Sequence, residues 1–184
     1  MSPSGVQVLP PPGTWRSDPA RTYIGFVARH LMVQRVRGRF EEFDVTVDIA
    51  DPPEDSAIRV ELGAISINTG APDRDAQIRS ADFLDVERFP KLIFESTSVI
   101  RDDDGWKVIG DLTVRDRTSP VELGVSFLGL MPDPRGGTRA IFEGATELNR
   151  EQWGLTWNRA VEGGRLVSKK IRIEIESELV RATD

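Results

Sequence analysis

Apolar and polar residues alternate along most of the chain. From Phe43 to Ile49 every second residue is apolar, and acidic or hydroxyl residues stand between them. The run near the C-terminus is the clearest, because Ile171, Ile173 and Ile175 are separated by charged residues. A strand with one face on a core and the other in water has this period of two, and the pattern is typical of antiparallel sheet. The alternation therefore predicts an all-β chain.

Turn-forming residues separate the alternating runs. Asp104-Gly105 stands between two runs and is a strong hairpin signal. Segments 51–55, 132–137 and 162–165 are rich in proline or glycine. Successive hairpins predict a meander of about eight strands, which must close or split because a long exposed edge invites aggregation. Several runs of roughly ten residues exceed the ~5–6 usual for sandwich strands, so a single antiparallel barrel is favoured.

A segment from about 72 to 88 departs from this alternation and has the features of a helix. Pro72 suits a first helical position, where its missing N–H costs nothing. Asp75 and Arg79 stand four residues apart and would meet on one helix face as an ion pair. Pro90 ends the segment before the next strand. The sequence therefore predicts a short helical insert between two strands of the sheet.

Length, charge and composition narrow the classes of function. A chain of 184 residues fits one domain with a full core. The net charge of −6 argues against a nucleic-acid partner, which needs a basic face. The chain has no cysteine, so disulfides and thiolate chemistry are excluded, and its single histidine makes a metal site a poor expectation. No run approaches the ~20 apolar residues of a transmembrane helix.

The first residues have the composition of an arm that precedes the domain. Three consecutive prolines, Pro10 to Pro12, favour an extended polyproline conformation. The residues before them have neither the basic nor the apolar region of a secretory signal peptide. We therefore predict a disordered or extended arm over residues 1–14, one barrel domain over residues 15–184, and a cytoplasmic location.

Short motifs spread along nearly the whole chain resemble those of one known family. They are Asp18-Pro19, Ile24-Gly-Phe26, His30-Leu-Met-Val33, Val36-Arg-Gly38-Arg-Phe40, Ser66-Ile-Asn-Thr69, Gly110-Asp-Leu-Thr-Val114, Thr118-Ser-Pro120-Val121 and Gly154-Leu-Thr-Trp-Asn158. In this order, from about Trp15 to Val180, they resemble the YceI-like family. The resemblance implies an eight-stranded, lipocalin-like barrel that binds a polyisoprenoid or another lipidic chain.

The inward-facing rows supply the candidate ligand contacts. Their aliphatic and aromatic side chains are interrupted by small residues, which leaves either a filled core or a narrow apolar cavity. His30 would donate to a head group at the cavity mouth, or would tie a strand end to a loop. Arg79 would meet an anionic head group, or would only pair with Asp75. Trp153 would close one end of the barrel and contact the ligand from there. The predicted ligand-binding residues are Phe26, His30, Phe43, Arg79, Phe83, Phe94, Leu112, Phe127, Phe142 and Trp153.

Three functions fit these features. The first is non-enzymatic binding, transport or storage of a polyisoprenoid, quinone or fatty acyl chain. This function needs no cofactor, because the apolar molecule is the bound ligand. The second is an enzyme with a lipidic substrate, whose base would be His30 with Glu95 or Glu143. The third is an interaction module with a filled core, and homodimerisation is compatible with all three. We expect the first, because the resemblance to the YceI-like family implies this ligand class and the strand pattern makes a container physically possible. Each buried methylene would contribute ~0.8 kcal/mol without any directional contact.

Overall fold

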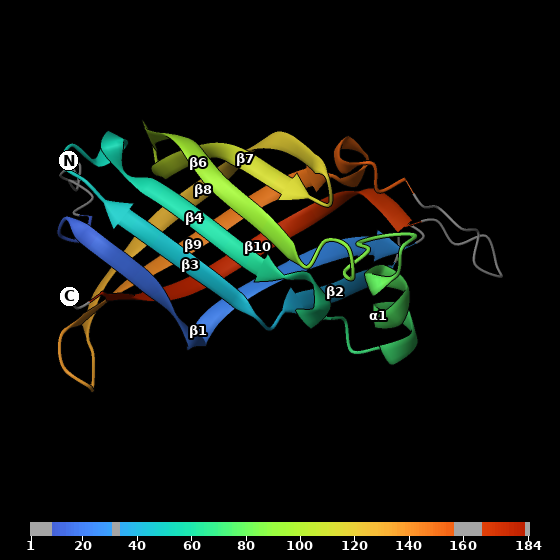
Figure 1. Ribbon diagram of the computed structural model, residues 1–184. Coiled ribbons are helices and arrows are strands. Elements are labelled where there is room, and N and C mark those ends of the chain that lie inside the picture. The colour runs from blue at the N-terminus through green and yellow to red at the C-terminus, as the bar shows by residue number, and fades with distance from the viewer. Residues whose placement is uncertain (1–8, 31–33, 157–166, 183–184) are drawn as a thin grey trace.

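The chain folds into a barrel with one helix outside it. The computed structural model describes residues 9–30, 34–156 and 167–182 (Figure 1). The strands are β1 (Gly13–His30), β2 (Gln34–Phe40), β3 (Phe43–Ile49), β4 (Ala57–Gly63), β5 (Ile67–Asn68), β6 (Lys91–Asp102), β7 (Gly105–Val114), β8 (Arg117–Pro132), β9 (Thr138–Asn149) and β10 (Val167–Arg181). The helix α1 covers Pro72–Arg79, and the short 3-10 turns are η1 (Pro53–Asp55), η2 (Ala64–Ser66) and η3 (Arg150–Trp153).

These strands form a closed barrel of eight. Their order is β10-β9-β8-β7-β6-β4-β3-β1-β2-β5, and an additional pairing between β1 and β10 closes the sheet. The long strand β1 pairs with β3 through its first half and with β2 through its second half, so β2 and β3 act as one bent strand. In the same way β5 pairs with β2 while β4 pairs with β3, so β4 and β5 continue one another. The predicted eight-stranded antiparallel barrel is therefore confirmed.

The predicted turns and insert also take their expected places. β6 ends at Asp102 and β7 begins at Gly105, as the hairpin signal indicated. The helix α1 is shorter than the predicted insert, because Ser80 ends it and turns follow before Pro90. β1 begins at Gly13, inside the range predicted for the arm. Among the described residues, no helix is long and apolar enough to cross a membrane.

The barrel has two different ends. At one end, the terminal end, the first residues of β1 and the last residues of β10 lie together (Figure 1). At the other end, the helix end, α1 packs against β5, and η3 follows the end of β9 (Figure 1). This distinction matters because two of the predicted ligand contacts, Arg79 on α1 and Trp153 on η3, lie at the helix end.

A buried group of charges joins three strands at the terminal end. Arg139 on β9 is 6% exposed and its Nη1 lies 2.8 Å from Asp18 and 3.2 Å from Glu178. Its Nε lies 3.5 Å from Asp133 in the β8–β9 loop. The hydrogen bond from Arg139, and a second from the Ala20 N–H, hold the pKa of Asp18 below its usual value. The Asp18-Pro19 motif thus lies at the irregularity of β1 between Ser17 and Thr22, where it connects β1 to β9.

The ion pair predicted within α1 does not form. Asp75 is buried and instead accepts hydrogen bonds from the Thr69 N–H (2.9 Å) and hydroxyl (2.5 Å). Arg79 donates from Nη2 to the Ile67 carbonyl at 2.7 Å. The strand and loop before the helix provide both side chains with partners, and these contacts attach α1 to β5. The prediction was wrong because it considered the helix without its tertiary neighbours.

Candidate functional site

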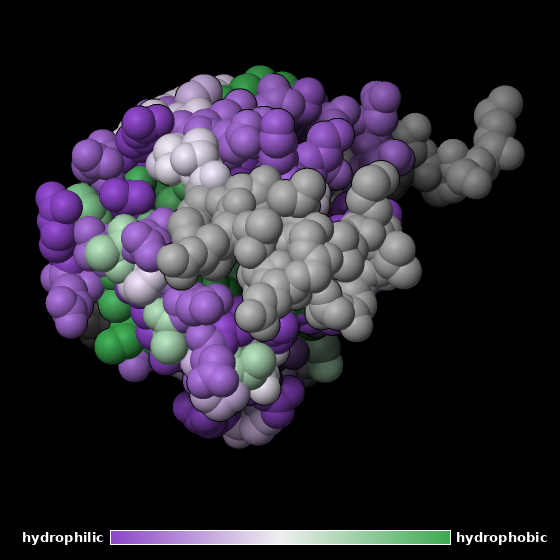
Figure 2. Space-filling view, turned by 90° about the vertical axis from the view of Figure 1, so that its right-hand side faces the viewer, coloured by the Kyte–Doolittle hydropathy of each residue, from purple (hydrophilic) through white to green (hydrophobic). Residues whose placement is uncertain are grey.

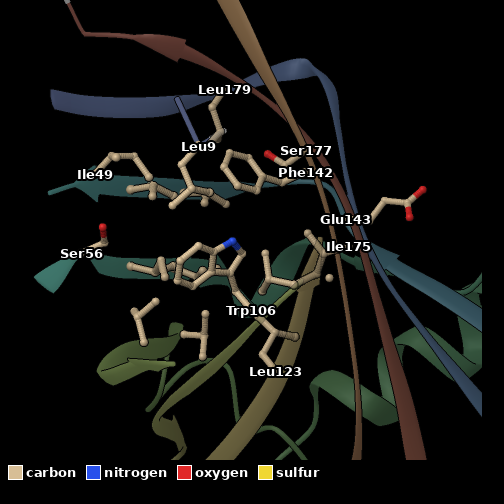
Figure 3. A pocket seen from close by; sticks show the side chains of 18 of the residues that line it. Leu9, Ile49, Ser56, Trp106, Leu123, Phe142, Glu143, Ile175, Ser177 and Leu179 are labelled. Atoms are coloured by element: carbon tan, nitrogen blue, oxygen red, sulfur yellow. The ribbon is translucent and has the colours of Figure 1, made fainter. Parts of the chain in front are cut away.

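An apolar cavity lies inside the barrel in the half nearer the terminal end (Figure 3). Its volume is about 90 Å³. That is several times the roughly 10–15 Å³ that one water molecule needs, and well below the roughly 300–1,000 Å³ of sites for drug-sized molecules. Most of the wall is aliphatic and comes from the inward rows of the sheet, including Val45, Val47, Val60, Val108, Leu123 and Val125. The cavity therefore suits a thin apolar chain segment.

Small residues in the wall keep this space open. Gly144 lines the cavity from β9, where it pairs with Val125 on one side and Ile175 on the other. A Cβ at Gly144 would lie 3.6 Å from atoms of Leu123 and Ile175, an ordinary van der Waals distance. The glycine thus leaves room that larger side chains at the same position would fill.

The N-terminal arm covers the terminal end of the cavity. Leu9 is one of the lining residues and packs against the core (Figure 3). The segment after it is held by two hydrogen bonds: the Trp15 indole N–H donates to the Pro11 carbonyl at 3.1 Å, and Arg181 donates to the Pro12 carbonyl at 2.8 Å. The polyproline segment is therefore bound to the barrel, and it positions Leu9 at the cavity.

Trp153 closes the opposite end. Its side chain is 2% exposed, and its indole N–H donates to the Leu112 carbonyl at 2.8 Å. Arg150, also in η3, is buried and donates to the carbonyls of Leu155 and Ser168. Burial lowers the pKa of Arg150 from its ordinary value. These contacts anchor η3 across the barrel, so the helix end is a packed plug.

The structure brings one of the ten predicted ligand-binding residues to the cavity wall, and that residue is Phe142. Arg79 stays on α1, and Trp153 belongs to the plug. Phe94 is buried in the core, and the His30 side chain lies outside the described residues. The others pack against the core away from the cavity wall: Phe26, Phe43, Phe83, Leu112 and Phe127. Ligand contacts at these positions stay predictions.

Sequence reasoning did not select Trp106, Leu9 or Ser177, which do line the cavity. Trp106 belongs to an alternating apolar row, so the signal for its inward direction was present. Leu9 precedes the first strand and has no such pattern. The sequence pattern does not give the position of each residue along the barrel axis, and that position decides which inward residues line the cavity.

The surface around the helix end has a different character. Figure 2 shows mostly hydrophilic residues over the described part of this face. An open hollow there is lined by Glu41, Asn68, Asp75 and Arg79, among others. Within the described ranges, no cluster of three or more histidine or carboxylate side chains could hold a metal ion. The apolar cavity is therefore the better candidate site.

Comparison with known proteins identifies the family. The model of the YceI-like domain matches residues 15–179. A UPF0312 protein of Staphylococcus aureus (strain N315) is 35% identical over 167 residues, which covers 88% of this chain and 94% of that protein. A UPF0312 protein of Serratia proteamaculans is 37% identical over 136 residues, covering 73% of this chain and 70% of that protein.

Solved structures share the fold at low sequence identity. Burkholderia cenocepacia BcnA superimposes with a TM-score of 0.77 at 18% identity, over 91% of this chain and 99% of that one. A polyisoprenoid binding domain from Saccharophagus degradans, implicated in plant cell wall breakdown, has a TM-score of 0.65 at 11% identity, over 93% of this chain and 99% of that one. With the match to the domain model and the relatives above 30% identity, this chain belongs to the YceI-like family.

Proposed function

We propose that the protein binds a long apolar molecule, such as a polyisoprenoid, a quinone or a fatty acyl chain, and carries or stores it without altering it chemically. The observation that carries this proposal is the apolar cavity inside a closed barrel. The Saccharophagus domain, a polyisoprenoid binder with the same fold, supports this ligand class. Homodimerisation and a cytoplasmic location stay predictions.

The size of the cavity limits what it can hold. At about 90 Å³ it accepts part of a chain, so the rest of a longer ligand must extend past Leu9 or displace core side chains. Each methylene that leaves water contributes ~0.8 kcal/mol, so a few buried methylenes already give useful affinity. The shape therefore favours a thin, flexible chain over a rigid polycyclic ligand.

The positions of the candidate bases support binding without catalysis. Glu95 is exposed on the outer face and forms an ion pair with Arg59 at 2.6 Å. Glu143 borders the cavity, but its carboxylate points away from the other labelled side chains (Figure 3). Neither carboxylate could therefore act as a base on a ligand inside the barrel.

Native mass spectrometry of freshly purified protein tests the proposal. We expect a discrete added mass that organic extraction releases as a prenyl, quinone or acyl species. Protein that purifies without ligand should gain such a mass after incubation with prenyl and acyl lipids. If the mass stays that of the bare chain in both experiments, the binding function is wrong, and the interaction module with a filled core becomes the better hypothesis.

A further inference from the structure

One hydrogen-bond donor inside the cavity has no partner. Trp106, the second residue of β7, is 4% exposed, and its Nε1 is buried without a hydrogen-bond acceptor. Figure 3 shows the indole nitrogen turned towards the middle of the cavity. The other two tryptophans in the described ranges, Trp15 and Trp153, both donate to backbone carbonyls. Trp106 is therefore the exception among them.

The neighbouring polar groups do not serve this donor. The Ser56 hydroxyl accepts from the Ala50 N–H at 2.9 Å, and the Ser177 hydroxyl pairs with Thr22 at 3.1 Å. The Arg101 guanidinium lies over the indole ring, 5.1 Å from its centre, and a cation cannot accept a hydrogen bond. A buried donor without a partner costs free energy, so a hydrogen bond from this N–H to an acceptor on a bound molecule would be favourable.

The surroundings restrict the kind of acceptor. No basic side chain is among the described residues that line the cavity, and the walls around the indole are aliphatic. Arg101 lies over the indole ring but is exposed to solvent and does not line the cavity, so a charged oxygen would lose its hydration there with little compensation, whereas a neutral carbonyl loses less. An ester, ketone or quinone oxygen therefore fits this position better than a carboxylate or a phosphate.

We propose that the cavity of this protein selects an apolar chain that carries a neutral oxygen acceptor, which the Trp106 indole N–H binds. The inference rests on the proposed function and adds the chemical class of the ligand. Because Trp106 lies near the terminal end of the barrel, the oxygen-bearing part of the ligand lies at that end, and the hydrocarbon points inward towards Phe142 and Ile175.

A competition experiment tests the hydrogen bond. Wild-type protein and Trp106→Phe are each equilibrated with the same cyclodextrin mixture of methyl palmitate and heptadecane. The protein is then separated by gel filtration, and its bound molecules are extracted and quantified by gas chromatography. Cyclodextrin delivers the ester and the hydrocarbon with different efficiency, but this difference cancels in the comparison because both proteins are equilibrated with the same mixture. We expect the bound ratio of ester to hydrocarbon to fall by about tenfold in Trp106→Phe, the size of one buried hydrogen bond.

Two controls separate the hydrogen bond from a change in cavity shape. Leu123→Val removes a methylene from the wall. It should weaken the binding of both methyl palmitate and heptadecane and leave the ratio of bound ester to bound hydrocarbon unchanged. In wild-type protein with labelled tryptophan, the Trp106 indole N–H resonance should move when methyl palmitate is added and stay in place with heptadecane. This second measurement does not depend on the folding of any variant.

The outcomes distinguish the two proposals. If both molecules bind, but with the same ratio in wild type and Trp106→Phe, and the indole resonance responds to both alike, the Trp106 role is refuted while apolar binding stands. If palmitate displaces methyl palmitate at neutral pH, the preference for a neutral acceptor is refuted. If neither molecule binds, the proposed function itself fails.

Discussion

Replacing Gly144 with leucine should close the cavity from its own wall. A Cβ at this position fits between Leu123 and Ile175 at 3.6 Å, so Gly144→Ala should fold normally and leave most of the space free. A leucine continues past that point into the volume that the ligand would use. The substitution therefore blocks the cavity without removing any contact of the present core.

The expected loss follows from the atoms that the leucine adds. Beyond the Cβ, leucine places about three further carbons in the cavity, and each takes the place of about one ligand methylene. At ~0.8 kcal/mol for each methylene, binding should weaken by about 2.4 kcal/mol, or roughly 60-fold in Kd. Gly144→Ala adds one carbon against the wall and should change Kd by no more than about fourfold.

Titration with the methyl ester of a fluorescent fatty acid measures these dissociation constants in the wild type and both variants. Ala145→Leu is the matched control, because it adds a large side chain to the next residue of β9, on the opposite face of the strand. Thermal denaturation checks that each variant folds. If Gly144→Leu folds and binds as tightly as Gly144→Ala, the ligand does not occupy this cavity, and the reasoning from its shape is refuted.

Three further predictions concern the ends of the barrel. Leu9→Ala should open the terminal end and shift the preference towards longer chains, as measured by competition within a series of fatty acid methyl esters; an unchanged preference would mean that the arm does not limit the cavity. The pKa of Asp18 is lowered in the folded state, so its contribution to stability is present above its ordinary value of 3.8 and is lost as pH falls through the folded value. Asp18→Asn should therefore lower the urea midpoint at neutral pH, and the difference from wild type should shrink in acid; a difference independent of pH would contradict this account. Trp153→Ala should destabilise the fold by about 3–5 kcal/mol in urea unfolding, and a loss below about 1 kcal/mol would contradict its role as a plug.

Much of the architecture follows from the sequence by itself. The alternation along β3 and β10 already shows which side chains face inward, because a period of two is a local property of any strand. The Asp104-Gly105 turn and the start of the insert at Pro72 are local in the same sense, and both are confirmed. These features, together with motifs in the order typical of the family, are sufficient to predict an eight-stranded barrel with a helical insert.

The tertiary structure alone decided where along the barrel the space lies. Phe43 and Val47 share one inward row of β3, yet Val47 lines the cavity and Phe43 does not. Alternation gives the same signal along the whole strand, whereas the position along the axis depends on register with strands distant in sequence. Likewise, Trp106 is a potential ligand contact because the fold provides no acceptor for its indole, and an unpaired donor becomes evident only when all its neighbours are in place.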